Sequence, residues 1–196
     1  NQGLSMRTSI THPELFSTVF ESSTKSRLHR PITGVSNDSR EIKNGDLYLA
    51  IKGDRFDGHQ FLDQALLNGA VAALVCNINN EIDIQQIRVN DTLNAIAKIA
   101  NKWRMNFDIP IIGITGSNGK TSTKELLLHV LSSKFKTHAT KGNFNTSIGL
   151  PLTLLDIEPD HDISIIEMGA SVPGEIESLC EIARPTHGII TNIAPA

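Results

Sequence analysis

Residues 111–122 of the chain read IIGITGSNGKTS, an apolar run followed by a glycine-rich loop, a lysine and two hydroxyl residues. The apolar run predicts a buried strand, and the hydroxyl residues open a helix. Glycines let backbone N–H groups turn toward an anion, while the positive end of the helix, the Lys120 ammonium and the Thr121 hydroxyl can reach terminal phosphates and a magnesium ion. A phosphate-binding loop explains this stretch better than an ordinary turn, in which Gly-Lys-Thr is rare.

The loop supplies the candidate nucleotide-binding residues. These are Gly116, Ser117, Asn118, Gly119, Lys120, Thr121 and Ser122. Its spacing differs from the general P-loop, because the nearest upstream glycine is Gly113 and not the residue at position 114. Lys120 is the strongest catalytic candidate, since the helix dipole disfavours a cation in the first turn unless an anion meets it.

Composition indicates a globular protein with room for two small domains. The 196 residues are 39% hydrophobic and 20% charged, and a net charge of -3 offers no general attraction to nucleic acid or to anionic membranes. The longest nearly apolar stretch, residues 66–76, is far too short to cross a bilayer, and residues 1–7 lack the apolar core of a signal peptide. Two cysteines without metal-ligand spacing fit a reducing compartment, so we predict a cytoplasmic protein. From the charge and the short apolar stretches we expect no nucleic-acid partner and no membrane insertion. We also expect a monomer.

Alternating apolar runs and helical patterns predict an α/β protein with two domains, residues 1–107 and 108–196. In the first, a short helix at 13–20 precedes strands at 32–35, 47–51 and 71–75, with a helix ending at Gly69 and a polar loop at 53–59. Asp91 stands at an N-cap position before a helix of about four turns, and residues 106–110 form the linker. This domain is a small α/β unit.

The second domain is predicted to be the start of a P-loop-type parallel sheet with helices on both faces. Its expected elements are strands at 111–115, 163–168 and 188–193, a helix carrying apolar residues from 126 to 135, and a helix at 173–183. Gly116, Glu167 and Asn192 fall at strand ends, where ligands bind in such sheets, so one pocket can gather them. Since few strands are present and the chain stops directly after one, we interpret it as part of a longer enzyme.

Glu167 is the candidate magnesium ligand and second catalytic residue, together with Thr121 as a metal ligand. A carboxylate at the end of an apolar strand is costly unless it is paired or coordinated, and magnesium takes one or two protein carboxylates. For Glu167, a structural ion pair with Arg184 or a bond to a backbone turn stays open, and helix capping stays open for Thr121. Asn143 and Asn145 follow a glycine, and both turn-forming and substrate-binding roles stay open for them.

A second set of candidates lies on two loops of the first domain. These substrate-binding candidates are Ser39, Arg40, Asp57 and His59. Arginine suits bidentate phosphate binding, and neighbouring hydroxyl and backbone donors suit a diphosphate. Residue chemistry alone favours structural roles, with Asp38 capping a turn, Arg40 pairing with Glu41 or Asp46, and His59 capping the next helix.

Several motifs in order resemble the Mur ligase family, from about residue 32 to the end of the chain. The phosphate loop at 113–121 shows the same glycine offset as the ATP loop of these ligases. The other matching stretches are DSR (38–40), GDL (45–47), DGHQF (57–61), GNFN (142–145), IGLPLTL (148–154), EMGA (167–170), PGEI (173–176) and ITNI (190–193). Within the family the pattern is most similar to the ligases that add a dipeptide.

The resemblance implies three domains: one for the UDP-sugar end of the substrate, a central ATPase domain and a closing Rossmann-like domain. It implies that D-alanyl-D-alanine is joined to UDP-N-acetylmuramoyl-tripeptide through an acyl phosphate, with ATP and Mg²⁺ as cofactors, in peptidoglycan precursor synthesis. By this analogy Ser39, Arg40, Asp57 and His59 line the UDP-sugar site. The histidine and carbamylated lysine that the family uses downstream would follow residue 196, so we expect the chain alone to be inactive.

Two kinds of alternative remain open. One is another ligase of the same superfamily, either the diaminopimelate- or lysine-adding ligase or folylpolyglutamate synthetase. The DSR stretch at 38–40 argues against the folate enzyme, and GNFN with EMGA favours the dipeptide-adding ligase. The other is a nucleotide-binding module without catalysis, which the downstream histidine and lysine would distinguish.

Overall fold

The computed structural model describes residues 5–53 and 56–193. The chain forms two units, residues 1–99 and 100–196, which divide within helix α3 (Thr92–Arg104). Residues 54 and 55 of the expected 53–59 loop and the last three residues lie outside the described ranges. Within those ranges, no helix is both long enough and apolar enough to cross a membrane.

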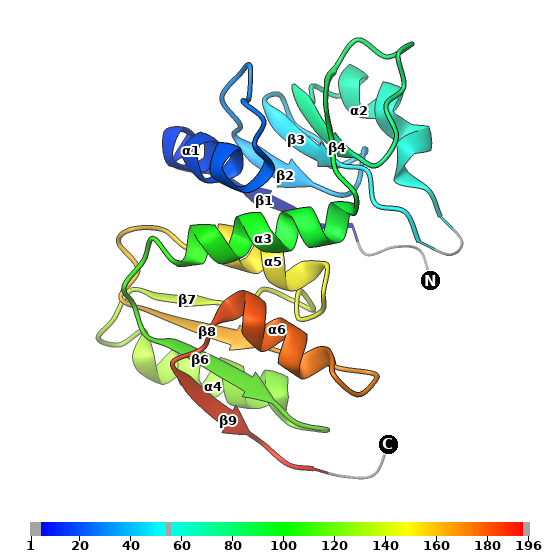
Figure 1. Cartoon of the computed structure of the whole chain (residues 1–196). Coiled ribbons are helices and arrows are strands. Elements are labelled where there is room, and N and C mark those ends of the chain that lie inside the picture. The colour runs from blue at the N-terminus through cyan, green and yellow to red at the C-terminus, as the bar shows by residue number, and fades with distance from the viewer. Residues whose placement is uncertain (1–4, 54–55, 194–196) are drawn as a thin grey trace. The chain divides into compact units, whose positions relative to one another are not determined.

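The first unit is built on a five-stranded sheet (Figure 1). The strands lie in sequence order, with β1 antiparallel to β2 and the other neighbours parallel. Their bounds are Arg7–Ser9 for β1, Gly34–Ser36 for β2, Asp46–Leu49 for β3, Ala72–Val75 for β4 and Gln85–Arg88 for β5. Strands β3 and β4 are buried along their whole length, as expected for central parallel strands covered on both faces.

Helices α1 (Pro13–Thr24), the 3-10 helix η1 (Gly58–Phe61) and α2 (Leu62–Leu67) belong to this unit. Leu62 and Ala65 of α2 form one apolar cluster with Tyr48 of β3 and Val75 of β4. Asp91 accepts a hydrogen bond from the Asn94 amide at 2.7 Å, which confirms the predicted cap at the start of α3.

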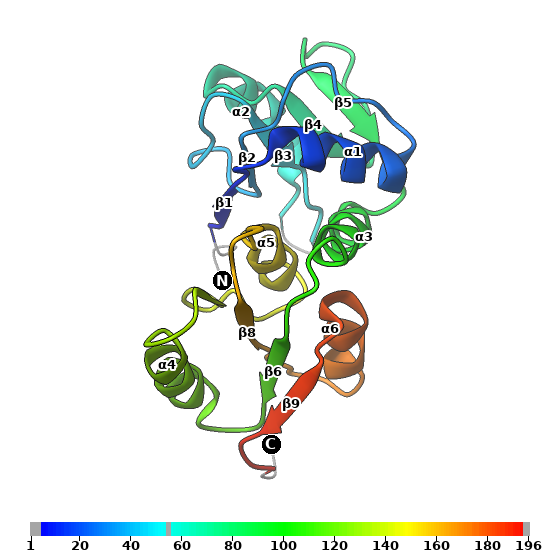
Figure 2. The ribbon, with the colours of Figure 1, turned by 90° about the vertical axis from the view of Figure 1, so that its left-hand side faces the viewer.

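The second unit is built on a four-stranded parallel sheet in the order β7-β8-β6-β9. Helices α4 and α6 cover opposite faces of this sheet (Figure 2), as predicted. The bounds are Ile111–Thr115 for β6, Lys120–Leu131 for α4, Thr137–Ala139 for β7, Gly149–Leu155 for α5, Ile163–Glu167 for β8, Glu175–Ala183 for α6 and His187–Ile190 for β9. Ile114 of β6 lies beside Glu167 of β8, and Thr115 lies beside Ile190 of β9, so three strands end at one edge.

The expected strands and helices are present with shifts of a few residues at their ends, and four elements had no sequence signal. Strands β1, β5 and β7 are too short and polar to produce an apolar alternation. Helix α5 carries Pro151 in its first turn, where proline is tolerated because the amides there have no intrahelical acceptor. All its residues are buried, so tertiary packing rather than amphipathic patterning accounts for it.

Candidate active site

The phosphate loop follows β6 and is held by the residues after β9. The Ser117 amide donates to the Asn192 carbonyl at 3.1 Å, and the Asn118 amide donates to Asn192 Oδ1 at 2.8 Å. The Thr191 hydroxyl donates to the Asn118 carbonyl at 2.5 Å. Gly116 has a φ of +137°, and a Cβ there would overlap the Thr191 hydroxyl and lie 2.9 Å from the Asn192 carbonyl oxygen. Only glycine therefore fits this position.

The loop leads into an uncapped helix start. Gly119 is the N-cap of α4 with a φ of +82°, and no side chain there accepts a hydrogen bond from the helix. The amides of the first turn therefore have no intrahelical acceptor and present the positive end of the helix dipole. Lys120 folds back so that its Nζ donates to the Gly116 carbonyl at 2.6 Å, while Ser122 is exposed in the first turn. This arrangement suits an anion.

Glu167 ends β8 with its side chain buried, 2% exposed, on the loop side of the sheet edge. Its Oε1 accepts hydrogen bonds from the Thr121 hydroxyl at 3.2 Å and from Asn145 Nδ2 at 2.9 Å. Its backbone amide donates to the Thr140 hydroxyl at 2.9 Å. Oε2 is buried and receives no hydrogen bond from any residue in the described ranges. A buried carboxylate oxygen in this state calls for a proton or a cation.

The donors around Glu167 suit a hard divalent cation. A carboxylate oxygen and a hydroxyl oxygen stand together beside a helix start, and magnesium is typically bound by one or two carboxylates together with substrate phosphates. In the described part of the chain, no three His, Cys, Asp or Glu side chains converge, so Glu167 is the one carboxylate beside the phosphate loop that the geometry brings to Thr121. Among the described residues, Arg184 makes no ion pair with Glu167, no backbone amide donates to the Glu167 carboxylate, and Thr121 does not cap α4. These structural alternatives are therefore wrong.

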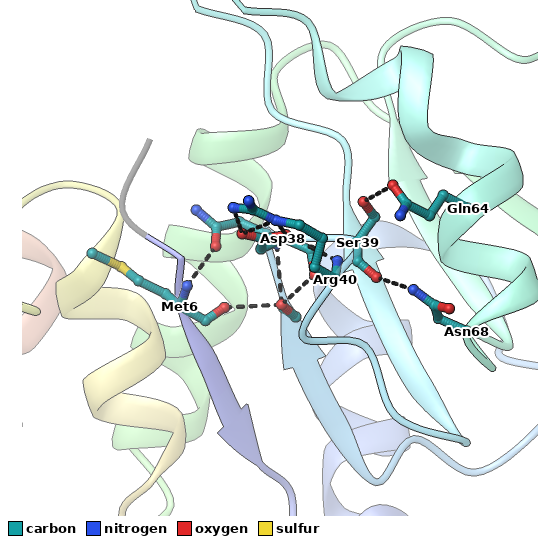
Figure 3. Close-up of polar contacts among 8 residues, drawn as sticks. Met6, Asp38, Ser39, Arg40, Gln64 and Asn68 are labelled. Carbon is teal, nitrogen blue, oxygen red and sulfur yellow. Dashed lines mark hydrogen bonds and ion pairs between the residues drawn. The ribbon is translucent and has the colours of Figure 1, made fainter. Parts of the chain in front are cut away.

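In the first unit, Ser39 and Arg40 lie in one turn (Figure 3). The Ser39 hydroxyl donates to Gln64 Oε1 at 2.8 Å, and its carbonyl accepts from Asn68 Nδ2 at 2.7 Å, so a buried serine ties the turn to α2. Arg40 is exposed and lies across Asp38, with Arg40 NH2 2.6 Å from Asp38 Oδ2. This ion pair lowers the pKa of Asp38 to about 2. The expected pairing of Arg40 with Glu41 or Asp46 is wrong, because Asp38 is closer.

Asp57 and His59 form a separate pair. Asp57 Oδ1 accepts from the His59 amide at 3.0 Å and lies 2.6 Å from His59 Nδ1, and these bonds lower the pKa of Asp57. His59 Nε2 accepts the Cys76 amide at 2.8 Å, which places the ring proton on Nδ1. In the part of the chain that the structure describes, no hydrogen bond links this pair to Ser39 or Arg40.

The structure therefore joins the loop, Thr121, Asn145 and Glu167 at one sheet edge, while Asn143 lies exposed two residues before Asn145. Sequence reasoning missed Thr140 and Lys124. Lys124 is buried on α4, and its Nζ donates to the Thr140 carbonyl at 2.8 Å. The sequence did hold a signal for Lys124. Residues three and four apart share a helix face, so Lys124 lies on the same face as Leu127, Leu128 and Leu131, where an apolar residue would be expected.

A parallel sheet in which a glycine-rich loop leads into an uncapped helix, with an acid at the end of the neighbouring strand, defines the class of P-loop-type α/β domains. Two family models match the chain: "Mur ligase family, catalytic domain" over residues 31–104, and "Mur ligase middle domain" over residues 114–196. The chain belongs to the Mur ligase family.

Curated relatives and solved structures agree with this assignment. A UDP-N-acetylmuramoyl-tripeptide–D-alanyl-D-alanine ligase of Synechocystis sp. is 47% identical over 167 residues, which are 84% of the chain and 37% of the relative. The Bacillus subtilis ligase of the same name is 42% identical over 83% of the chain and 36% of its own length. The chain thus spans little more than a third of these relatives.

Two solved structures share the fold. MurF from Acinetobacter baumannii superimposes with a TM-score of 0.85 at 34% identity, over 92% of the chain and 41% of that protein. MurF from Thermotoga maritima in complex with ADP superimposes with a TM-score of 0.74 at 40% identity, over 81% of the chain and 37% of that protein. These matches confirm the predicted α/β fold and the resemblance to the Mur ligase family.

Proposed function

We propose that this chain supplies the nucleotide site and the UDP-substrate site of an ATP-dependent ligase that adds D-alanyl-D-alanine to UDP-N-acetylmuramoyl-tripeptide, for peptidoglycan precursor synthesis. The observation that carries the proposal is the buried, unpartnered Oε2 of Glu167 beside Thr121 at the start of an uncapped helix. The names of the relatives supply the substrates. The reaction would run through an acyl phosphate. The proposed domains are residues 1–107 and 108–196. That the protein is a cytoplasmic monomer stays a prediction.

Each group in the loop has a role in this proposal. The free amides of the first turn of α4 bind phosphate oxygens, and Lys120 leaves the Gly116 carbonyl to meet the transferring phosphoryl group. Thr121 and Glu167 would hold Mg²⁺, which supplies Lewis-acid neutralisation of phosphate charge. Most of the catalysis of phosphoryl transfer comes from such positioning and charge stabilisation.

The substrate candidates have separate roles. Arg40 is exposed and held by Asp38, so its outer N–H groups can bind a diphosphate in the UDP-sugar site. Ser39, Asp57 and His59 are engaged within the first unit and would shape the loops that carry this site. Asn145 contacts Glu167 and, with Asn143, would face the reacting end of the substrate.

The test uses the intact protein with ATP, Mg²⁺, UDP-N-acetylmuramoyl-tripeptide and D-alanyl-D-alanine, and measures phosphate release that depends on the dipeptide. We expect Lys120→Ala and Glu167→Gln each to lower turnover by roughly 100-fold or more, the usual loss for one charge-stabilising group. Lys134→Ala is the matched control, because Lys134 is exposed after α4. Unchanged turnover in Lys120→Ala, or phosphate release without the dipeptide, would refute the proposal.

A further inference from the structure

Lys124 is buried, at 2% exposure, in a helix on which the apolar side chains of Leu126 and Val130 are exposed. Its ammonium donates to the Thr140 carbonyl at 2.8 Å and lies 2.9 Å from Glu125 Oε1, whose side chain is 59% exposed. Burying an ammonium is costly unless its hydrogen bonds are well made, and a leucine would satisfy the packing without that cost. The position of Lys124 therefore calls for a reason beyond packing.

Thr140 connects Lys124 to the candidate metal ligand. Its carbonyl accepts the Lys124 ammonium, and its own amide donates to the Ile165 carbonyl at 3.0 Å. Its hydroxyl accepts the Glu167 amide at 2.9 Å. Thr140 is itself buried, at 2% exposure, so each of these bonds is sheltered from water. The backbone and side chain of Thr140 thus make hydrogen bonds to Lys124, to β8 and to Glu167.

Helix α4 consequently reaches Glu167 by two routes. Thr121 contacts the carboxylate directly, and one turn later Lys124 fixes Thr140, which fixes the backbone at Glu167. The carboxylate has one oxygen held by Thr121 and Asn145 and the other buried without a partner. Its orientation is therefore defined by the groups behind it, as is usual for metal ligands whose outer-shell partners set their geometry.

We propose that Lys124 and Thr140 are positioning residues that hold the Glu167 carboxylate in place for a divalent cation. This inference rests on the proposed function, because the cation is the one that accompanies the nucleotide. Neither residue touches the cation or the phosphates. Loss of either one leaves Glu167 present but less well oriented, so metal affinity falls while contacts between the loop and the nucleotide persist.

The experiment measures binding of Mn²⁺, a paramagnetic probe of magnesium sites, to the intact protein with ADP by electron paramagnetic resonance. We expect Lys124→Met and Thr140→Val to weaken Mn²⁺ binding by roughly 10-fold or more, the usual effect of removing an outer-shell partner. Thr140→Ser keeps the hydroxyl and should retain affinity close to that of the unmodified protein. Lys134→Met is the control for the lysine substitution, because Lys134 is exposed.

A second measurement separates positioning from a general structural effect. ADP binding in EDTA should change by less than about 2-fold in every variant, since outer-shell changes act on the metal. Unchanged Mn²⁺ affinity in folded Lys124→Met and Thr140→Val, or an equal loss of ADP affinity in EDTA, would overturn the inference. If the unmodified protein binds Mn²⁺ no better with ADP than without, the proposed function itself fails, and the positioning role falls with it.

Discussion

Two buried side chains in the described part of the chain keep an atom without a hydrogen-bond partner: Glu167 Oε2 and His138 Nε2. They differ in their surroundings. Glu167 lies at the end of β8 beside the phosphate loop, whereas His138 lies within β7 with its Nδ1 2.7 Å from the Ser164 hydroxyl. His138 Nε2 is 3.7 Å from Asp156 Oδ2, too far for a good hydrogen bond. The first atom fits a ligand site, and the second makes the fold sensitive to pH.

Burial lowers the pKa of His138 to about 4, outweighing the attraction of Asp156, while His161 and Lys141 lower it further. Between about pH 6.5 and 4 the unfolded chain therefore binds a proton that the folded chain does not, and stability falls as pH falls through this range. We expect the free energy of unfolding to drop by on the order of 2 kcal/mol from this group between pH 7.5 and 5.

Denaturant unfolding of the unmodified chain and of His138→Gln at several pH values measures this contribution, because glutamine can keep the bond to Ser164 without titrating. The free energy of unfolding should depend less steeply on pH in His138→Gln than in the unmodified chain. In His129→Gln this pH dependence should be unchanged, since His129 is exposed on α4. Identical pH profiles for all three proteins would show that His138 does not carry the effect.

At the scale of elements, strand β1 carries a partly buried ion pair that links it to β3. Arg7 Nε lies 2.7 Å from Asp46 Oδ2, and Arg7 NH2 lies 2.8 Å from Asp46 Oδ1, so the pair is bidentate. Asp46 is fully buried at the start of β3, and its Oδ2 also accepts the Lys43 amide. The ion pair thereby links the three-residue strand β1 to β3, in addition to the hydrogen bonds between β1 and β2.

Removing the arginine should be costly, because it leaves a buried carboxylate without its counter-charge. We expect Arg7→Met to lower the free energy of unfolding by about 3 kcal/mol or more. Arg40→Met is the matched comparison, since the Arg40 side chain is exposed, and an ion pair with an exposed arginine contributes little to stability. Thermal or denaturant unfolding compares the two variants, and equal losses would contradict a special role for the buried pair.

At the scale of the whole molecule, the two units are stabilised by different contacts. Thr92, at the start of α3, donates to the Ala50 carbonyl in the first unit. Near the other end of α3, Trp103 donates to the Ile157 carbonyl and Arg104 to the Ala183 carbonyl, both within the second unit. The candidate phosphate and metal groups all belong to the second unit, and the four candidate UDP-sugar residues all belong to the first.

A ligand stabilises the unit that binds it, because only the folded form has the site. We therefore expect Mg²⁺ with ADP to slow amide hydrogen exchange in β6, β8 and the start of α4, and to leave β3 and β4 nearly unchanged. Hydrogen exchange read by mass spectrometry on peptides from each unit tests this expectation. Protection confined to the first unit would place the nucleotide elsewhere and refute the assignment of the loop.

Local patterns were sufficient for a large part of the fold. Long apolar runs identified β3, β4, β6 and β8, and the Asp91 cap located the start of α3, because strands buried on both faces and capped helices carry their signal in consecutive residues. The glycine-rich loop and Glu167 were found in the same way, as strand ends that converge in a parallel sheet. Whether the predicted site residues bind their ligands stays a prediction.

Other features depended on partners distant in sequence. The residues that brace the site, Lys124, Thr140 and Asn192, are linked by contacts spanning 16, 27 and 74 positions, respectively, and short elements such as β7 and α5 form only through tertiary packing. A phosphate loop can be predicted from the sequence, because the backbone geometry and the helix dipole that bind the phosphate are set by consecutive residues. The direction in which Glu167 presents its free oxygen is a property of the folded chain, because side chains from α4 and from the segment after β7 are brought to the end of β8 and set it.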